Sequence, residues 1–181
     1  MWVLTKKNVN NELVTKARLV ARGFQETDKI QSDSPTCHKD SFKIFLCVAA
    51  SYQWNLECTD VKSAFLQSKT FDREVFIEPP PEAKIPGYIW RLNKCMYGLQ
   101  DASRQWYLSV VNVLQSLGCF QLKLDPAVFA FVKEGQLCGL IIIHVDDFLH
   151  IGNLFFHEHV IEKSREKFLI GLDVVYWIGC C

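Results

Sequence analysis

Two adjacent acids, Asp146 and Asp147, stand between two apolar segments of the chain, 137–143 and 148–151. Short apolar runs bounded by polar residues predict buried strands, so this region predicts a strand, a tight connection and a second strand. Adjacent carboxylates are costly if they are buried without partners. The simpler interpretation is a hairpin turn, because Asp is frequent in turns. The alternative is a shared chemical role, which needs partners from elsewhere in the chain.

Asp60 is a candidate partner, because it ends another predicted strand, 54–61. A carboxylate at the end of one strand and a pair between two others can converge at the surface of one sheet. Three such charges repel one another unless cations offset them, and carboxylate oxygens suit hard ions such as Mg²⁺. Two ions of this kind can clamp the attacking and leaving oxygens of a phosphoryl transfer. The three aspartates therefore predict a site for two Mg²⁺ ions, with Mn²⁺ as the alternative.

The other segments mix strands and helices without strict alternation, which predicts an α+β fold with an antiparallel sheet and helices packed on one face. Helices are expected at 41–53, 103–117 and 157–168, with Asp40 or Ser41 capping the first. Segment 62–72 is expected to be helical or irregular. Strands are expected at 1–5, 13–21, 54–61, 74–78, 88–92, 128–132, 137–143, 148–151 and 173–178. Gly118 is expected to end the second helix, and Glu134-Gly135 to form a turn.

Composition narrows the classes of function. A length of 181 residues suits one domain, and a formal net charge of zero counts against a freestanding nucleic-acid binder, although basic residues are concentrated in 1–22. The eight cysteines form no C-x-x-C pair, which favours reduced, buried thiols. No signal peptide is evident and no apolar run reaches the length of a membrane span. These features predict an intracellular protein without a membrane partner.

Several sequence blocks, taken together and in order, resemble the reverse transcriptase of copia-type LTR retrotransposons. They are Trp2-Val3 with Lys6, Lys16-Ala17-Arg18-Leu19-Val20-Ala21-Arg22-Gly23-Phe24, Ser34-Pro35, Asp60-Val61-Lys62-Ser63-Ala64-Phe65-Leu66, Glu74-Val75-Phe76-Ile77 with Pro79-Pro80, Met96-Tyr97-Gly98-Leu99, Arg104-Gln105-Trp106-Tyr107, Asp125-Pro126, and Val145-Asp146-Asp147 with Gly152-Asn153. The resemblance covers nearly the whole chain.

The resemblance implies a reverse-transcriptase palm with partial fingers, cut short at both ends and without thumb, RNase H or integrase. By this likeness, 1–50 and 66–100 are fingers-like, and 51–65 and 101–181 are palm-like. It implies RNA- and DNA-templated DNA synthesis as part of a retrotransposon Pol protein. The partners would be an RNA template, a DNA primer, dNTP and other parts of the Pol polyprotein. The location would be cytoplasmic, in a virus-like particle, with nuclear entry.

The resemblance also implies roles for individual side chains. Asp60, Asp146 and Asp147 would be the catalytic, metal-binding carboxylates. Phe65 would face the sugar of the incoming nucleotide, and its alternative is a plain core phenylalanine. A further set would lie near the nucleotide or the template backbone, with solvated surface cations as the alternative for the basic members: Lys16, Arg18, Arg22, Asp101 and Arg104. Lys16, Arg18 and Arg22 are expected to share one face of a strand.

Two departures from the family pattern concern the predicted site. His144 stands where the family has Tyr before Val-Asp-Asp, next to the primer end, and Asp101 stands where the family has Gln. They support a second hypothesis, a catalytically inactive retrotransposon remnant or a co-opted nucleic-acid-binding protein. A third hypothesis is a metal-binding module of His157, His159, Cys180 and Cys181, although His-x-His on a helix points its two rings to different faces.

Overall fold

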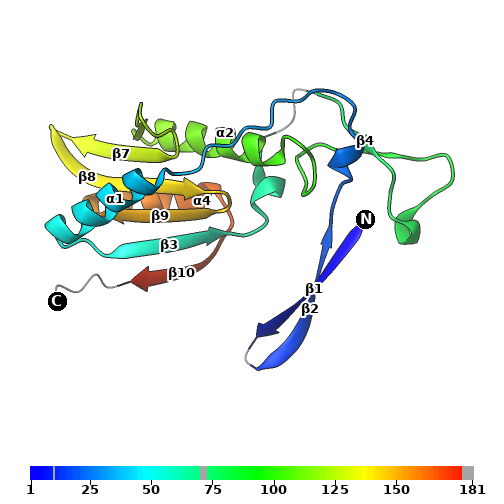
Figure 1. The fold of residues 1–181 in the computed structure, drawn as a ribbon, viewed down its shortest axis with the longest axis horizontal. Helices are drawn as coiled ribbons and strands as arrows, with labels where there is room; N and C mark the ends of the chain where they lie inside the picture. Colours follow the sequence, from blue (N-terminus) through cyan, green and yellow to red (C-terminus); the bar gives the residue numbers. More distant parts are fainter. Residues whose placement is uncertain (10, 70–72, 177–181) are drawn as a thin grey trace.

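The computed structural model describes residues 1–9, 11–69 and 73–176, and its main feature is a six-stranded antiparallel sheet (Figure 1). Its strands lie in the order β10-β3-β9-β8-β7-β6. Their bounds are β3 Leu56–Val61, β6 Phe120–Gln121, β7 Val128–Lys133, β8 Gln136–His144, β9 Asp147–Gly152 and β10 Ile170–Tyr176. The hairpin of β7 and β8 turns at Glu134-Gly135, where both residues have positive φ, as predicted. The antiparallel α+β class is confirmed.

Helices cover both faces of this sheet, so the expectation of helices on one face is wrong. One face carries α2 (Ala102–Ser116) and the helical run of α3 (Leu154–Phe156), the π-helical η4 (His157–Ile161) and α4 (Glu162–Lys167). The other face carries α1 (Lys39–Tyr52), which crosses the front of the sheet in Figure 1. None of the helices in the described residues is long and apolar enough to cross a membrane.

Strand β8 explains the two covered faces, because its consecutive apolar residues point alternately to opposite sides of the sheet. Ile141 and Ile143 belong to the core under α2 and α4, whereas Leu140 and Ile142 belong to the core under α1. Each of these four side chains is at least nine-tenths buried. Full burial of one such side chain stabilises the fold by about 1.5–3 kcal/mol. The central strands are therefore held from both sides.

Helix α1 begins at Lys39, so neither Asp40 nor Ser41 is its cap. His38 occupies the N-cap position and makes no side-chain capping bond. Instead the carboxylate of Asp125, from the loop before β7, accepts a hydrogen bond of 2.8 Å from the backbone N–H of His38. An anion at this position satisfies a backbone donor and complements the helix dipole. The cap is supplied by a residue distant in sequence.

The remaining elements form a smaller part at the other end of the molecule. It contains the hairpin of β1 (Trp2–Val9) and β2 (Glu12–Leu19), and the short pair β4 (Phe76–Ile77) and β5 (Trp90–Arg91). Two 3₁₀ turns accompany them, η1 (Gly23–Gln25) and η3 (Pro81–Ala83), and a third, η2 (Ala64–Gln67), packs against both this part and the core under α2. Figure 1 shows the β1–β2 hairpin projecting away from the six-stranded sheet. Helix α1, which our division grouped with the fingers-like residues, packs instead on the sheet.

The hairpin joins the rest of the chain through its exit segment. The backbone N–H of Ala21 donates to the carbonyl of Tyr97 at 2.7 Å, and that of Gly23 donates to the carbonyl of Gly98 at 3.0 Å. Gly98 has a φ of +91°, and a Cβ there would overlap the carbonyl of Ala21. Only glycine combines this backbone conformation with so close an approach. The residues 96–99 therefore connect the hairpin to the sheet.

Candidate active site

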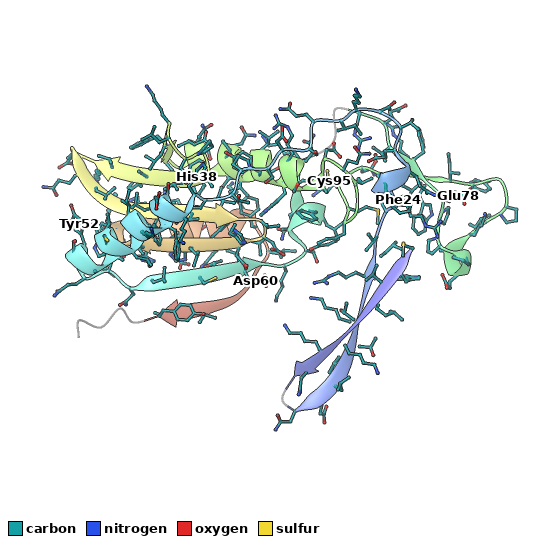
Figure 2. All side chains as sticks on the ribbon, in the orientation of Figure 1. Phe24, His38, Tyr52, Asp60, Glu78 and Cys95 are labelled. Atoms are coloured by element: carbon teal, nitrogen blue, oxygen red, sulfur yellow. The ribbon has the colours of Figure 1, made fainter. Side chains whose placement is uncertain are left out.

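The pairing of β3 with β9 sets Asp60 directly opposite Asp147. The N–H of Val61 also donates to the carbonyl of Asp146 at 3.0 Å, which continues the ladder into the β8–β9 turn. Residues opposite each other in an antiparallel pair project from the same face. Figure 2 shows Asp60 at the end of β3 nearest the hairpin. The backbone thus brings the three acids together at the ends of their strands, as the sequence predicted.

The acid pair divides between turn and strand. Val145 and Asp146 form the turn between β8 and β9, and Asp147 is the first residue of β9. Asp146 is therefore a turn residue, as the simpler interpretation predicted, and it also lies close to Asp60. Val145 has a φ of +56°, which is unusual for a β-branched residue. The indole N–H of the buried Trp106, in α2, donates to the Val145 carbonyl at 2.8 Å and holds this conformation.

The electrostatics of the site reflect three neighbouring carboxylates. Burial raises the pKa of Asp147, and the charges of Asp146 and Asp60 raise it further, whereas His144 opposes the increase. A raised carboxyl pKa means that the ionised form is held at a cost, which a cation would relieve. The side chain of Asp60 is exposed, and a Cβ on Gly171 of β10 would come within 2.6 Å of its Oδ2. Glycine at this position leaves room for the Asp60 carboxylate.

Tyr97 connects the acids to the hairpin, and sequence reasoning did not select it. Burial raises the pKa of its phenol, with further contributions from Asp146 and Asp60, while Arg18 lowers it. The guanidinium of Arg18 lies 5.9 Å from the centre of the Tyr97 ring. The ring of Phe65 is 4.8 Å away on another side. The only sequence signal for Tyr97 was its place in the block 96–99. That block does not indicate which of its side chains faces the acids.

The other predicted residues fall into different environments. Phe65 lies in η2, is partly buried and packs against two core clusters, which supports the core interpretation without removing it from the site. Lys16 and Arg18 are exposed on β2. Strand β2 ends at Leu19, so the prediction that Arg22 shares their strand face is wrong. Arg104, near the start of α2, donates to the carbonyl of Asp33 at 3.2 Å.

Asp101 lies in a different environment from the one we expected. Its side chain is buried and accepts from Arg73 at 2.8 Å and 3.2 Å. The same guanidinium donates to Glu26 at 3.0 Å, and the backbone N–H of Gln100 donates to the other oxygen of Glu26. Asp101 thus ties the start of α2 to the segment after the hairpin. Asp101 is therefore not a free carboxylate that would repel a triphosphate.

Two hollows in the described surface lie away from the aspartates. One, of about 500 Å³, lies at the base of the hairpin between 19–26 and 75–81. The other, of about 800 Å³, lies beside the start of β3 and the helix that follows β9. Of the three aspartates, Asp60 is exposed, whereas Asp146 and Asp147 are half-buried.

The chain matches the family model described as reverse transcriptase (RNA-dependent DNA polymerase) over residues 1–171. It is 32% identical to the Retrovirus-related Pol polyprotein from transposon RE2 of Arabidopsis thaliana, over 98% of this chain and 13% of that protein. The corresponding protein from transposon TNT 1-94 of Nicotiana tabacum is 34% identical over 83% of this chain and 12% of that protein. The Ty1-DR4 Gag-Pol polyprotein of Saccharomyces cerevisiae is 30% identical over 93% and 10%.

The chain belongs to the copia-type reverse transcriptase family. It spans about a tenth of the length of these Pol polyproteins. The resemblance predicted from the ordered blocks is thereby confirmed, and the retrotransposon Pol context is that of the relatives. The family membership does not by itself assign a role to any side chain described above.

Within this copia-type chain, His144 is the departure closest to the acids. It is exposed at the end of β8 and is the cross-strand partner of Asp147.

The third hypothesis, a metal-binding module, has different outcomes for its four residues. His159 stacks on Phe155 with ring centres 3.7 Å apart, and among the described residues it is not part of the cluster that contains His157. Cys180 and Cys181 lie outside the described residues, as do 177 and 178 of the last predicted strand and 70–72 of the predicted irregular segment.

The described cysteines lie in environments of different exposure. Cys95, Cys119 and Cys138 are buried, and Cys47 is exposed on α1. Burial raises the pKa of the Cys119 thiol to about 12, so this thiol behaves as a small apolar side chain. The prediction of buried thiols is therefore confirmed for part of the set and wrong for Cys47.

Proposed function

We propose that this chain catalyses nucleotidyl transfer onto a primer, templated by RNA or DNA, with Asp60, Asp146 and Asp147 as its catalytic, metal-binding carboxylates. The observation that carries the proposal is the β3–β9 register, which sets Asp60 opposite Asp147 and bonds Val61 to the Asp146 carbonyl. In this assignment the six-stranded sheet with its helices is the palm. The hairpin and residues 73–100 form the partial fingers.

The donor set fits divalent cations. Three carboxylates offer hard oxygen ligands. Burial, and then the charges of Asp146 and Asp60, raise the pKa of Asp147, and a bound cation would favour its ionised form. Bound there, two Mg²⁺ ions, or Mn²⁺ in their place, supply a lowered pKa for the primer 3′-hydroxyl and charge neutralisation for the departing pyrophosphate. The chain's own contribution is to hold the three acids next to one another through the β3–β9 register. The Trp106 bond to Val145 keeps the turn bearing Asp146 in one conformation.

The nucleotide would lie between the acids and the hairpin. Tyr97 and Phe65 form an aromatic pair on this side, and Phe65 in this arrangement limits the space for a 2′-hydroxyl. Arg18, 5.9 Å from the centre of the Tyr97 ring, would contact a phosphate, because guanidinium groups bind phosphate oxygens through paired donors. Lys16 lies further along the same strand face and would contact the template backbone. Arg104 and Arg22 would act as additional contacts to the nucleic acid.

A specific observation favours the second function, an inactive remnant that binds nucleic acid. His144, the cross-strand partner of Asp147, replaces the family's tyrosine at the primer end. Its smaller ring would support a primer terminus less well.

As a piece of Pol, the chain would act with the other parts of that polyprotein. It would do so in the cytoplasm, within a virus-like particle, and later enter the nucleus.

The experiment is primer extension on poly(rA)/oligo(dT) with Mg²⁺, using the full chain. We expect extension by the wild type, and a loss of at least about 100-fold in Asp60→Asn and in Asp146→Asn, since each removes a charge that acts on the transition state. Asp40→Asn is the matched control, because Asp40 is a highly exposed acid on α1. It should extend the primer as the wild type does. Substitution of His144 by Tyr should raise the rate.

Two outcomes would contradict the proposal. Extension that survives in Asp146→Asn would remove the acids from the mechanism. Folded wild-type protein that binds the primer–template, shifts its electrophoretic mobility and never extends it, with His144→Tyr equally inactive, would favour the nucleic-acid-binding remnant.

A further inference from the structure

A second cluster of metal-binding side chains lies on the opposite face of the same strands. Glu57 on β3 and His150 on β9 are cross-strand partners, and His157 reaches them from the helix that follows β9. One ligand atom from each of the three lies within 4.8 Å of the other two. Nε2 of His157 is 3.8 Å from Oε1 of Glu57, and the His150 and His157 rings are 5.5 Å apart at a steep angle.

His150 is the unusual member of this cluster. It is 1% exposed, and its Nδ1 has no hydrogen-bond partner among the described residues. Its other nitrogen, Nε2, lies 3.1 Å from the Thr59 hydroxyl. A buried imidazole nitrogen without a partner is costly, since it has lost water and gained nothing. Burial also lowers the pKa of His150 to about 3, with smaller contributions from His157 and Arg165, so the ring is neutral near pH 7.

We propose that Glu57, His150 and His157 bind one Zn²⁺ ion. Two imidazoles and one carboxylate are a common three-residue ligand set for zinc, with a fourth position left for water. If Nε2–H of His150 donates to the Thr59 hydroxyl, the ring is in the tautomer whose Nδ1 lone pair can bind the metal. This site is separate from the three aspartates, and it does not depend on the function proposed for them.

To bind zinc, the three ligand atoms would have to close from separations of up to 4.8 Å. Ligand atoms around a tetrahedral zinc ion are separated by about 3.4 Å, as follows from metal–ligand distances near 2.1 Å. The pair His157–Glu57 is already at 3.8 Å. Glu57 and His157 line the hollow of about 800 Å³, which gives the ion a path from solvent and room for its water ligand.

The charges near the site are compatible with a cation. Glu57 supplies one negative charge within the cluster. Arg165 is the neighbouring positive group, and its guanidinium is itself paired with Glu162 at 3.1 Å, which offsets its repulsion. Hard cations such as Mg²⁺ prefer an all-oxygen set, so the imidazoles select for zinc over the ions of the aspartate site.

A zinc ion here would clamp three elements together. It would fix β3 against β9 and attach the helical run 154–167 to both. Asp60 and Asp147 are three residues further along the same two strands, in the same register. The metal would therefore stabilise the pairing that aligns the acids, without contacting them.

The test is zinc binding by the full chain, after treatment with a chelator, followed by isothermal titration with ZnCl₂ and by thermal unfolding. We expect one ion per chain and a higher unfolding midpoint in zinc. His157→Gln and Glu57→Gln should each weaken binding by at least about tenfold. Both positions are partly exposed, so the variants should fold, which circular dichroism checks.

His159→Gln is the matched control, because it lies on the same helix but stacks on Phe155 outside the cluster. It should bind zinc as the wild type does. Substitution of Co²⁺ for zinc separates this site from adventitious thiol binding. The cobalt complex should show visible bands of nitrogen and oxygen ligands without a strong thiolate charge-transfer band. No binding, a thiolate spectrum, or equal affinity in folded His157→Gln would overturn the proposal.

Discussion

The six-stranded sheet and the β1–β2 hairpin hold their functional residues in different ways. The sheet aligns its aspartates through strand register, with helices packed on both faces. The hairpin presents Lys16 and Arg18 on a strand whose residues are nearly all exposed, and it joins the molecule at 96–99. The aspartates have to lie close to one another, and buried packing of the sheet positions them. Lys16 and Arg18 would contact a flexible substrate, for which an exposed strand face is sufficient.

This comparison predicts that substitutions in the sheet act on stability and those in the hairpin act on binding. The largest effect is expected at Trp106, which is 1% exposed and bonds the Val145 carbonyl. Trp106→Ala should lower the free energy of unfolding by about 3–5 kcal/mol, the range for removal of a large buried aromatic. Urea unfolding measures it. A loss below about 1 kcal/mol would mean that the turn is held by something other than α2.

The next effect concerns the junction between the two regions. Asp101→Gln restores the residue typical of the family, but it removes the buried partner of Arg73. We expect a loss of about 1–3 kcal/mol in unfolding free energy, reduced from the value for a fully buried pair because Arg73 is partly exposed. Chemical denaturation measures it. Unchanged stability together with higher polymerase activity would instead support a role for residue 101 at the nucleotide.

The Asp125 cap should make stability depend on pH. Burial raises the pKa of Asp125, but hydrogen bonds from Ser41, His38, Ala127 and Cys37 outweigh it, and the pKa lies below its ordinary 3.8. A carboxyl with a lowered folded pKa stabilises above the unfolded value and loses this contribution as pH falls through the folded value. Asp125→Asn should cost about 1–2 kcal/mol at pH 7. That difference should shrink below about pH 3.8, the usual Asp value. A constant difference across the acid range would contradict this cap.

The smallest effect on stability is expected in the hairpin. Lys16→Ala and Arg18→Ala remove exposed side chains, and exposed positions usually change unfolding free energy by less than about 0.5 kcal/mol. Arg18→Ala should nevertheless raise the KM for nucleotide, and Lys16→Ala should weaken template binding and reduce its salt dependence. Steady-state kinetics at two salt concentrations measure both. Glu12→Ala, on the same strand, is the control. Unchanged kinetics in Arg18→Ala would leave the hairpin without its proposed role.

Local signals in the sequence predicted much of the fold. The apolar runs on either side of the Glu134-Gly135 turn predicted the β7–β8 hairpin, and α2 ends just before Gly118, whose φ is +88°. The two strand ends bearing the acids were also predicted. The placement of α1 on the second face was missed, although the continuous apolar run of β8 is typical of a strand that is buried on both sides. Local periodicity predicts which faces of an element are buried. It does not predict which other element covers each face.

Contacts between distant residues account for the rest of what was missed. The carboxylate that caps α1 comes from position 125, and the cation that neutralises Asp101 comes from position 73. Nothing near either residue in the sequence indicates such a partner. The same holds for Glu57 and His150, which are neighbours only through strand register. Roles inferred from family likeness alone, such as that of Asp101, were therefore the least secure.

The most direct measurement is Mn²⁺ binding by the full chain with primer–template, followed by the electron paramagnetic resonance signal of the free ion. We predict that the wild type binds Mn²⁺ and that the Asp60→Asn, Asp146→Asn double variant loses this binding. His157→Gln should retain it, because the histidine cluster lies on the other face of the strands. Equal binding by the wild type and the double variant would contradict the claim that the β3–β9 register builds a metal site.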